Sequence, residues 1–341
     1  MKYLISLVLL VTWSSIFCQS QRLTEVVDSY HKLIDSQKEK YKSAWPDFTS
    51  PFKKQELLTY KKLLRELSEV DKTTFNTQEL INIELLELIL QDNIDNRVYR
   101  AELFPLSAEG GFIISMIYSI QGKSLNDEES INQYELLLAD TPRYINQQIA
   151  LMRTGLTENK VMPKLVAKNC LALVRKIQED GFAFLKLPLS KTDIPDASKV
   201  KFASHIDGPI KESFNRLELF LNEEYIPQTN AAVGIGRCKD GKRFYEQRVR
   251  YYTTLDMTPK EVFELGKQEV ARIKGEMEQI ISDLEFEGNF SEFLQFLRTD
   301  ERFYAETPQD LLNHAAWLSM KAQEILPRYF TILPSLSLIH I

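Results

Sequence analysis

Apolar residues recur at spacings of three and four along most of the chain, a pattern typical of amphipathic α-helices. The longest example follows Thr258-Pro259, where Glu261 stands three residues after the threonine. A threonine N-cap, a proline at the first helical position and a glutamate at the third form a strong helix-start signal. We therefore predict a long helix from Pro259 with a single apolar stripe. The stripe consists of Val262, Gly266, Val270, Ile273, Met277, Ile280 and Leu284.

Further helices are predicted wherever this spacing returns between turn residues. Thr141-Pro142 and Thr307-Pro308 repeat the start signal. The stretch 78–91 is more apolar, so we expect it to be buried on two sides. Residues 242–254, rich in aromatic side chains, are the one stretch that favours a short extended segment. The other predicted helices cover residues 53–71, 142–153, 163–181, 209–224 and 308–326.

These elements together predict an all-α protein. No repeat of fixed period and no low-complexity linker divides the sequence. The simplest architecture is a helical array that runs from about Leu23 to Leu333 and needs more chain to close. A core cut in this way would leave apolar helix faces uncovered, which favours association.

Residues 1–20 have the pattern of a secretory signal peptide. Lys2 precedes an apolar run over residues 3–11, and Cys18 and Ser20 supply small residues before a cleavage point. The run is shorter than the roughly 20 apolar residues of a spanning helix, so we predict no transmembrane segment in the mature chain. Anchoring as a lipoprotein at Cys18 is the weaker interpretation, because bulky Phe17 stands where a small residue is normally needed. We expect an exported protein, either periplasmic or secreted.

The last residues resemble no natural chain end. Residues 336–341 (LSLIHI) follow Pro334 without a polar cap and look like a translated sequencing adapter. We therefore predict that residues 335–341 are a non-native tail, and we leave them out of the fold prediction.

Charge and cysteine content exclude several classes of partner and fold. The chain has 42 basic and 48 acidic residues; loss of residues 1–20 removes only Lys2 and leaves 41 basic ones, and no basic block appears. Nucleic acid is therefore a poor candidate partner. Of the three cysteines, Cys18 lies in the predicted signal peptide, and the two that remain are too few for a disulfide framework. Cys170 lies in an apolar helical run and is expected to be a buried free thiol, with a bridge to Cys238 as the alternative.

The sequence contains no recognisable catalytic centre. A helical zinc-hydrolase site needs two histidines four residues apart with a glutamate after the first. No pair among His31, His205, His314 and His340 has that spacing. No G-x-S-x-G elbow of a serine hydrolase is present either. We predict no catalytic, cofactor-binding or metal-binding residue in this chain.

One stretch, residues 240–252, combines four aromatic side chains with several basic ones after a turn. The simpler interpretation is a packed edge on which arginines stack against aromatic rings. The sharper interpretation is the wall of a groove for an extended peptide or a similar polar ligand. We favour packing and keep both.

Residues 251–280 (YYTTLDMTPKEVFELGKQEVARIKGEMEQI) resemble the signature region of the bacterial domain of unknown function 885 family. Members of that family show an R-Y-x-T-T segment, a T-P-E-E helix start and an L-G-x-x-E-V-x-R-I-x-x-E-M helix. Further similarities occur in residues 145–155, 222–227 and 297–304, so the resemblance covers most of residues 75–334. The matching residues of the helix are Leu265, Gly266, Glu269, Val270, Arg272, Ile273, Glu276 and Met277.

The resemblance implies a fold and an activity. The family resembles zinc metallopeptidases, with a large helical array around a substrate cleft. Its zinc motif, His-Glu-x-x-x-Gly-His, lies well downstream of the matching helix and has no counterpart in this sequence. The resemblance thus implies that residues 21–334 are the helical N-terminal part of the family domain, truncated before the metal-binding half. Gly241, Tyr245 and Tyr252 are our candidate cleft-lining residues.

Two hypotheses of function follow. In the first, the chain is the N-terminal part of an exported zinc-dependent peptidase-like hydrolase. It would contribute a helical wall and part of the cleft for a peptide or peptide-like substrate, with zinc bound only in the full-length parent, and would be inactive alone. In the second, it is an exported non-catalytic helical protein that binds a peptide or another ligand. The sequence that continues the reading frame distinguishes them.

Overall fold

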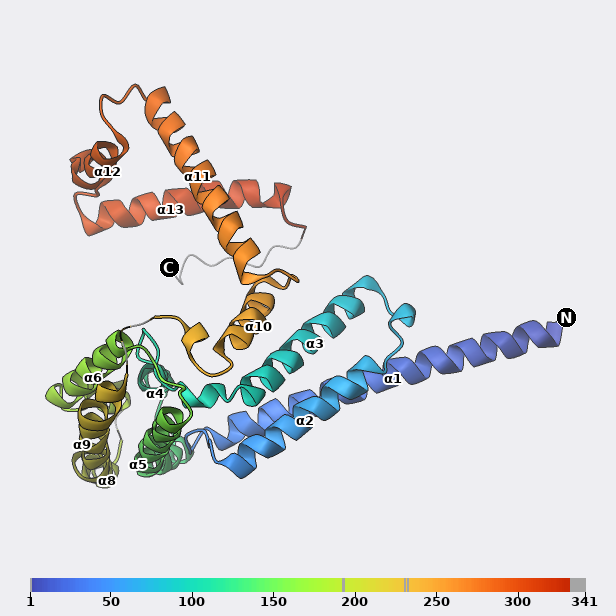
Figure 1. The fold of residues 1–341 in the computed structure, drawn as a ribbon, viewed down its shortest axis with the longest axis horizontal. Helices are drawn as coiled ribbons and strands as arrows, with labels where there is room; N and C mark the ends of the chain where they lie inside the picture. The colour runs from blue at the N-terminus through green and yellow to red at the C-terminus, as the bar shows by residue number, and fades with distance from the viewer. Residues whose placement is uncertain (1, 192–193, 230, 232, 332–341) are drawn as a thin grey trace. The chain divides into compact units, whose positions relative to one another are not determined.

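The computed structural model describes residues 2–191, 194–229, 231 and 233–331, and no residue in these ranges lies in a strand. The predicted all-α class is therefore confirmed. Short 3-10 or π-helical turns join several of the helices shown in Figure 1. The helices are α1 Lys2–Lys40, α2 Ser50–Ser68, α3 Thr77–Val98, α4 Phe112–Gln121, α5 Glu128–Thr157, α6 Lys164–Glu179, α7 Ala183–Lys191, α8 Asp196–His205, α9 Lys211–Leu219, α10 Gly241–Thr253, α11 Pro259–Asp283, α12 Phe290–Thr299 and α13 Pro308–Ile325.

The chain forms two compact units, Met1–Pro259 (unit 1) and Lys260–Ile341 (unit 2). The limits predicted for the signal peptide (1–20) and the family domain (21–334) remain predictions. The predicted non-native tail lies outside the described residues. No helix in the described part of the chain is both long and apolar enough to cross a bilayer.

The first part of unit 1 is a layer of three helices, α1 to α3. The last turn of α2 and the middle of α3 pack together through Leu67, Ile83 and Leu90, and α1 adds Val26. One face of α3 is buried, while Ile81 and Leu85 on its other face are 46% and 50% exposed. The prediction that residues 78–91 are buried on two sides is therefore wrong. Helices α2 and α10 both contact α3, but neither covers Ile81 and Leu85.

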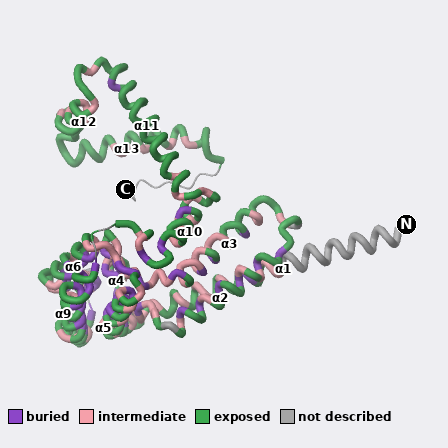
Figure 2. The backbone as a smooth tube through the Cα atoms, in the orientation of Figure 1, coloured by how far each residue is buried: buried purple, intermediate pink, exposed green. Residues whose placement is uncertain are grey.

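The second part of unit 1 is a bundle formed by α4 to α9. Its core is one continuous cluster in which Tyr134 packs edge-on against Phe202, and Phe182 against Phe214. Trp45, in the segment between α1 and α2, stacks on Tyr144 of α5 and so joins the layer to the bundle. Figure 2 shows this concentration of buried residues along α4, α5, α6 and α9.

Pro142 lies inside α5 and does not start a helix, so that prediction is wrong. The helix begins at Glu128, where Asp127 and Ser130 form a capping box. The hydroxyl of Thr141 donates to the carbonyl of Leu137 (3.0 Å) and accepts from the indole N–H of Trp45 (2.9 Å). Thr141 therefore does not cap a helix here; its hydroxyl makes buried hydrogen bonds in the middle of α5. The other pair, Thr307-Pro308, does start a helix: the Thr307 side chain accepts from the backbone N–H of Asp310 at the beginning of α13.

The extended segment suggested for residues 242–254 is also wrong, because Gly241–Thr253 form helix α10. Phe244, Arg248 and Tyr251 are spaced by four and three residues, which places them on one helical face. The Arg248 guanidinium lies over both rings, 5.3 Å from that of Phe244 and 4.9 Å from that of Tyr251, and pairs with Asp92 of α3. The aromatic and basic residues that suggested a strand are explained by this face.

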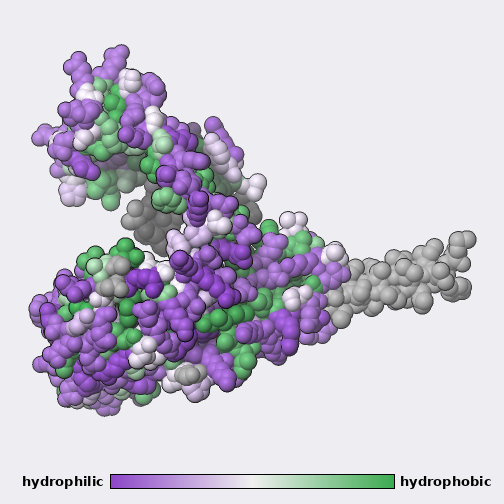
Figure 3. All heavy atoms as spheres, in the orientation of Figure 1, coloured by the Kyte–Doolittle hydropathy of each residue, from purple (hydrophilic) through white to green (hydrophobic). Residues whose placement is uncertain are grey.

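Unit 2 consists of α11, α12 and α13. Phe286, Phe293, Phe296 and Phe303 form a small aromatic cluster around α12. Among the described residues 260–331, only Ile281 is buried. Figure 3 shows apolar side chains open to view on this unit, and most of the predicted α11 stripe is exposed.

Candidate functional site

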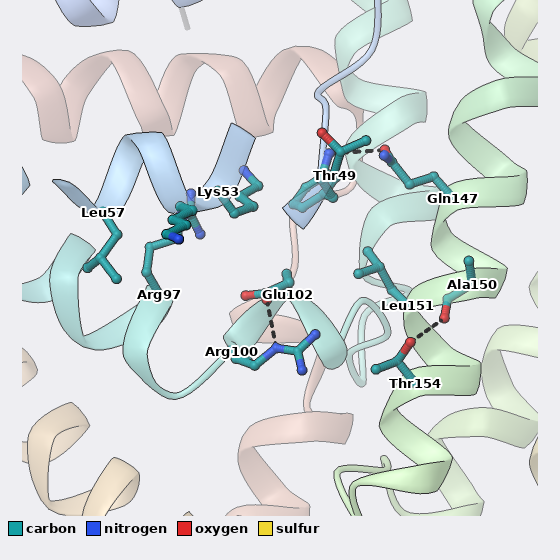
Figure 4. A pocket seen from close by; sticks show the side chains of 12 residues that line it. Thr49, Lys53, Leu57, Arg97, Arg100, Glu102, Gln147, Ala150, Leu151 and Thr154 are labelled. Carbon is teal, nitrogen blue, oxygen red and sulfur yellow. Dashed lines mark hydrogen bonds and ion pairs between the residues drawn. The ribbon is translucent and has the colours of Figure 1, made fainter. Parts of the chain in front are cut away.

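A recess of about 640 Å³ lies in unit 1 between the three-helix layer and the bundle. In Figure 4, side chains of α2 and α3 lie on one side of it and those of α5 on the other, with Arg100 and Glu102 between them. The lining residues are Phe48, Thr49, Lys53, Lys54, Leu57, Arg97, Arg100, Glu102, Gln147, Ala150, Leu151 and Thr154.

Local structure places the charged residues of the recess. Lys53 and Lys54 lie in the first turns of α2, which has a proline near its start after Thr49. Arg97 lies in the last turn of α3. Arg100 then adopts a left-handed backbone conformation (φ 57°), which is uncommon for a residue with a side chain. This turn ends α3 and leads directly into the 3-10 helix Ala101–Leu103 (η2), which carries Glu102.

A buried ion triad forms one wall. A single oxygen of Glu56, Oε2, accepts from Lys53 Nζ (3.0 Å) and from Arg97 Nε (3.1 Å), while Oε1 accepts from Gln37 (3.1 Å). Burial lowers the pKa of the Lys53 ammonium, and Arg97 lowers it further against the opposing effect of Glu56. The Lys53 ammonium also lies 4.4 Å from the ring centre of Phe48. The charges of Lys53 and Arg97 are therefore removed from water but paired with the Glu56 carboxylate.

The base of the recess contains an incompletely satisfied carboxylate. Nε of Arg100 lies 3.4 Å from Oε1 of Glu102, a long contact, and another guanidinium nitrogen of Arg100 pairs with Glu158. The Glu102 side chain is only 8% exposed. Its second oxygen, Oε2, is buried and has no hydrogen-bond partner. A buried acceptor without a donor is unfavourable, so this atom is a candidate contact for a ligand.

The α5 wall is uncharged. The Gln147 side chain accepts from the backbone N–H of Phe48 (3.1 Å) and donates to Asp47 (3.1 Å), so it ties α5 to the segment just before α2. Ala150 and Leu151 add apolar surface, and the hydroxyl of Thr154 donates to the carbonyl of Ala150 (3.0 Å).

The three residues predicted to line a cleft lie elsewhere, on α10. Tyr245 and Tyr252 are exposed, 51% and 77% respectively. Gly241 is buried at the start of α10, where a Cβ atom would lie 1.8 Å from the carbonyl oxygen of Ile235, so that the close approach of two backbone segments requires glycine. None of the three lines the 640 Å³ recess. Their role in a substrate cleft stays a prediction.

A second, more apolar cavity of about 370 Å³ adjoins the beginning of α10. Phe244 lines it together with Phe104, Met162 and Cys238. Cys170 and Cys238 are both buried and unbridged, as expected for Cys170. Burial raises the pKa of the Cys170 thiol to about 11, so it is not a reactive nucleophile at neutral pH.

Sequence reasoning did not identify the recess. Its charged side chains come from residues 53 to 102, with α5 closing the far side, and no short motif joins them. The one local signal, the left-handed conformation of Arg100, is not encoded by a glycine or asparagine. An arginine at that position gives no indication of a turn.

Comparison with known proteins identifies the family. Residues 34–339 match the family model described as bacterial protein of unknown function (DUF885). The chain belongs to this family. The resemblance noted from residues 251–280 is therefore confirmed, whereas the metallopeptidase-like activity attached to it is not part of that finding. No curated protein matches this family member.

A solved structure shares the fold. The crystal structure of a putative lipoprotein from Colwellia psychrerythraea matches this family member with a TM-score of 0.75 and 13% sequence identity. The match covers 94% of this chain and 61% of the other, so the chain spans about three fifths of that protein's length. At this identity the likeness shows the all-α fold alone.

Proposed function

We propose that the chain is the N-terminal part of an exported zinc-dependent peptidase-like hydrolase, to which it contributes a helical wall and part of the substrate cleft. The observation that carries the proposal is the 640 Å³ recess, which combines charged, polar and apolar lining in one helical body. Its charged and polar side chains lie beside apolar surface from Phe48, Leu57, Ala150 and Leu151, a lining suited to a ligand that has both polar and apolar parts. The reaction class comes from the resemblance of residues 251–280.

The described residues do not fit a zinc site. Among them, no group of three or more His, Cys, Asp or Glu side chains is arranged to hold a metal ion. We therefore assign no ligand to this part of the chain. In the whole protein, zinc would polarise a peptide carbonyl and lower the pKa of bound water toward about 7. The role proposed for the recess is to hold and orient the substrate.

Export is proposed from the sequence. Lys2, the apolar run over residues 3–11 and the small residues Cys18 and Ser20 are what support a cleaved signal peptide. A peptidase-like activity outside the cytoplasm would act on peptides taken up from, or released into, the surroundings.

The test compares residues 21–334 with the whole product of the native gene. We expect one zinc ion per chain in the whole product by metal analysis, and hydrolysis of a peptide mixture that stops with a chelator and returns with added zinc. We expect residues 21–334 to bind no stoichiometric zinc and to cleave nothing. One tightly held zinc in residues 21–334 would overturn the proposal that the zinc ligands lie outside this part of the protein. A whole product without zinc or hydrolysis would favour the non-catalytic binding protein.

A further inference from the structure

The recess carries more positive than negative charge, although the whole chain is acidic with a net charge of −6. Four cationic side chains line it, against one lining carboxylate, and two further carboxylates outside the lining pair with these cations. The cations are Lys53, Lys54, Arg97 and Arg100, and the carboxylates are Glu56, Glu102 and Glu158. An incoming anion is therefore attracted to this site.

The carboxylates leave some N–H donors of Arg100 and Lys54 without an acceptor. Arg100 is 41% exposed and has only a long contact to Glu102 besides its pair with Glu158, and Lys54 is exposed where it lines the recess. A guanidinium has five N–H groups in a planar fork that fits a carboxylate. Arg100 thus retains donors for a ligand carboxylate, and the neighbouring Arg97 and Lys53 add positive potential.

The unpartnered oxygen of Glu102 adds a second requirement. It is buried, it belongs to a residue that lines the recess, and it needs a hydrogen-bond donor. A simple carboxylate such as acetate would satisfy Arg100 and leave this oxygen without a donor. A ligand with a carboxylate and an N–H on the adjacent carbon offers both groups within a few ångströms.

We propose that the recess binds the C-terminal end of a peptide, with the terminal α-carboxylate on Arg100 and the neighbouring N–H directed to Oε2 of Glu102. The choice of a peptide rests on the proposed function, whereas the carboxylate and N–H chemistry rests on the recess. Leu57, Ala150 and Leu151 provide an apolar surface for the last side chain of the peptide. The ligand class is thus a peptide with a free C-terminus and a small or apolar last residue.

The experiment measures binding by calorimetry with a chelator present, so that hydrolysis plays no part. The probes are N-acetylated trialanine with a free C-terminus, its C-terminal amide, and free alanine. Charged hydrogen bonds of this kind change affinity by about 10- to 100-fold, so we expect the acid to bind at least tenfold more tightly than the amide. We also expect tighter binding of the peptide acid than of free alanine.

Two substitutions locate the site. Arg100→Gln should weaken binding of the peptide acid at least tenfold and abolish the preference for acid over amide, while Arg100→Lys should retain part of that preference. Glu102→Gln should weaken acid and amide alike, because the N–H is present in both. Arg175→Gln is the matched control: Arg175 is 48% exposed and pairs with Glu218 (2.7 Å) on the bundle. This variant should bind like the parent.

The outcomes separate this proposal from the hydrolase. Equal binding of acid and amide, no binding of either, or an unchanged affinity in Arg100→Gln with an unchanged melting curve would overturn the carboxylate site. Free alanine binding as tightly as the peptide would overturn the assignment to peptides. Because the assay needs neither zinc nor turnover, carboxylate-dependent binding in a protein that hydrolyses nothing would leave this site standing and remove only the proposed activity.

Discussion

Helices α6 of unit 1 and α11 of unit 2 are both amphipathic, yet only one of them is packed. The apolar face of α6 buries Ala167, Cys170, Leu171, Val174 and Ile177 within the bundle core. On α11 the corresponding face is open: Val270 is 67% exposed and Ile280 54% exposed, and Ile281 alone is buried. Figure 2 shows the same contrast between the two units.

The contrast shows what an apolar stripe predicts. Spacing by three and four residues specifies a helix with one face that gains by leaving water, at roughly 25 cal/mol per Å² of apolar surface buried. Whether that gain is realised depends on neighbouring elements. In unit 1, α5, α8 and α9 are available to cover α6 and one another. In unit 2 the exposed stripe is surface that would be stabilised by a covering partner.

The largest effect should come from deleting a core side chain in unit 1. Phe214 is completely buried and packs edge-on against Phe182 at 5.2 Å, so Phe214→Ala should lower the free energy of unfolding by about 3–5 kcal/mol. Val270→Ala on α11 is the comparison and should change it by less than about 0.5 kcal/mol. Urea denaturation followed by circular dichroism measures both. A loss of several kcal/mol at Val270 would mean that the α11 stripe is packed.

A somewhat smaller loss is expected from breaking the buried ion triad. Glu56→Gln leaves Lys53 and Arg97, which are 10% and 19% exposed, without their shared carboxylate and should cost about 3 kcal/mol. Glu276→Gln removes an exposed pair with Arg272 on α11 and should cost less than about 0.5 kcal/mol. Equal losses in the same denaturation assay would contradict the difference in burial.

The Glu56 variant also has a pH signature. The folded-state pKa of Lys53 is already lowered, so below the unfolded value of 10.5 the unfolded chain binds the proton more readily than the folded one. Stability therefore rises with pH between the folded and the unfolded pKa. Removing the Glu56 carboxylate lowers the folded pKa further and widens this window. The loss caused by Glu56→Gln should shrink as the pH rises toward 10.5, and a loss that grows with pH would rule out Lys53 as its source.

Local signals in the sequence predicted local structure well. The beginnings of α11 and α13 follow from Thr-Pro pairs, and α2 and α6 lie close to their predicted ranges. The same signal failed at Pro142, because Thr141 and Trp45 form a contact between residues 96 positions apart that no local pattern reveals. Aromatic composition failed at α10 for a similar reason, since Phe244 packs on Tyr99 of a distant segment.

The recess could not be predicted from the sequence either, because it too depends on contacts between residues far apart along the chain. Lys53 and Arg97 read in the sequence as solvated helix charges, and only the contact of α2 with α3 turns them into a buried triad with Glu56. Glu102, whose second oxygen has no partner, follows the left-handed turn at Arg100, which no glycine marks. The family, in contrast, was recognisable because its matching residues lie on one helix.

Removing a helix N-cap side chain should lower the stability by about 1 kcal/mol, and by a similar amount in both units. Asn76 and Asn289 each form a capping box, with Glu79 at the start of α3 and Glu292 at the start of α12. Replacing either asparagine by alanine leaves backbone N–H groups without an acceptor. The loss of helical signal on heating, measured for each variant, should move to lower temperature in both. A change confined to Asn76→Ala would mean that α12 is not held by its cap.

The smallest perturbation uses thiols as probes and alters no core residue. From Gln21 onward, Cys170 and Cys238 are the only cysteines. Both are buried, and with a pKa of about 11 only about one Cys170 in a thousand is ionised at pH 8, and still only about a tenth at pH 10. Neither should react with a thiol reagent in the folded chain, whereas Ile280→Cys, at a position 54% exposed on α11, should react at once and add one labelled thiol per chain. Rapid labelling of Cys170 at pH 8 would show that the bundle core opens to solvent. Protection of the introduced cysteine would show that the α11 stripe is covered in solution, and the comparison between the two units would then concern their packing partners and no longer their exposure.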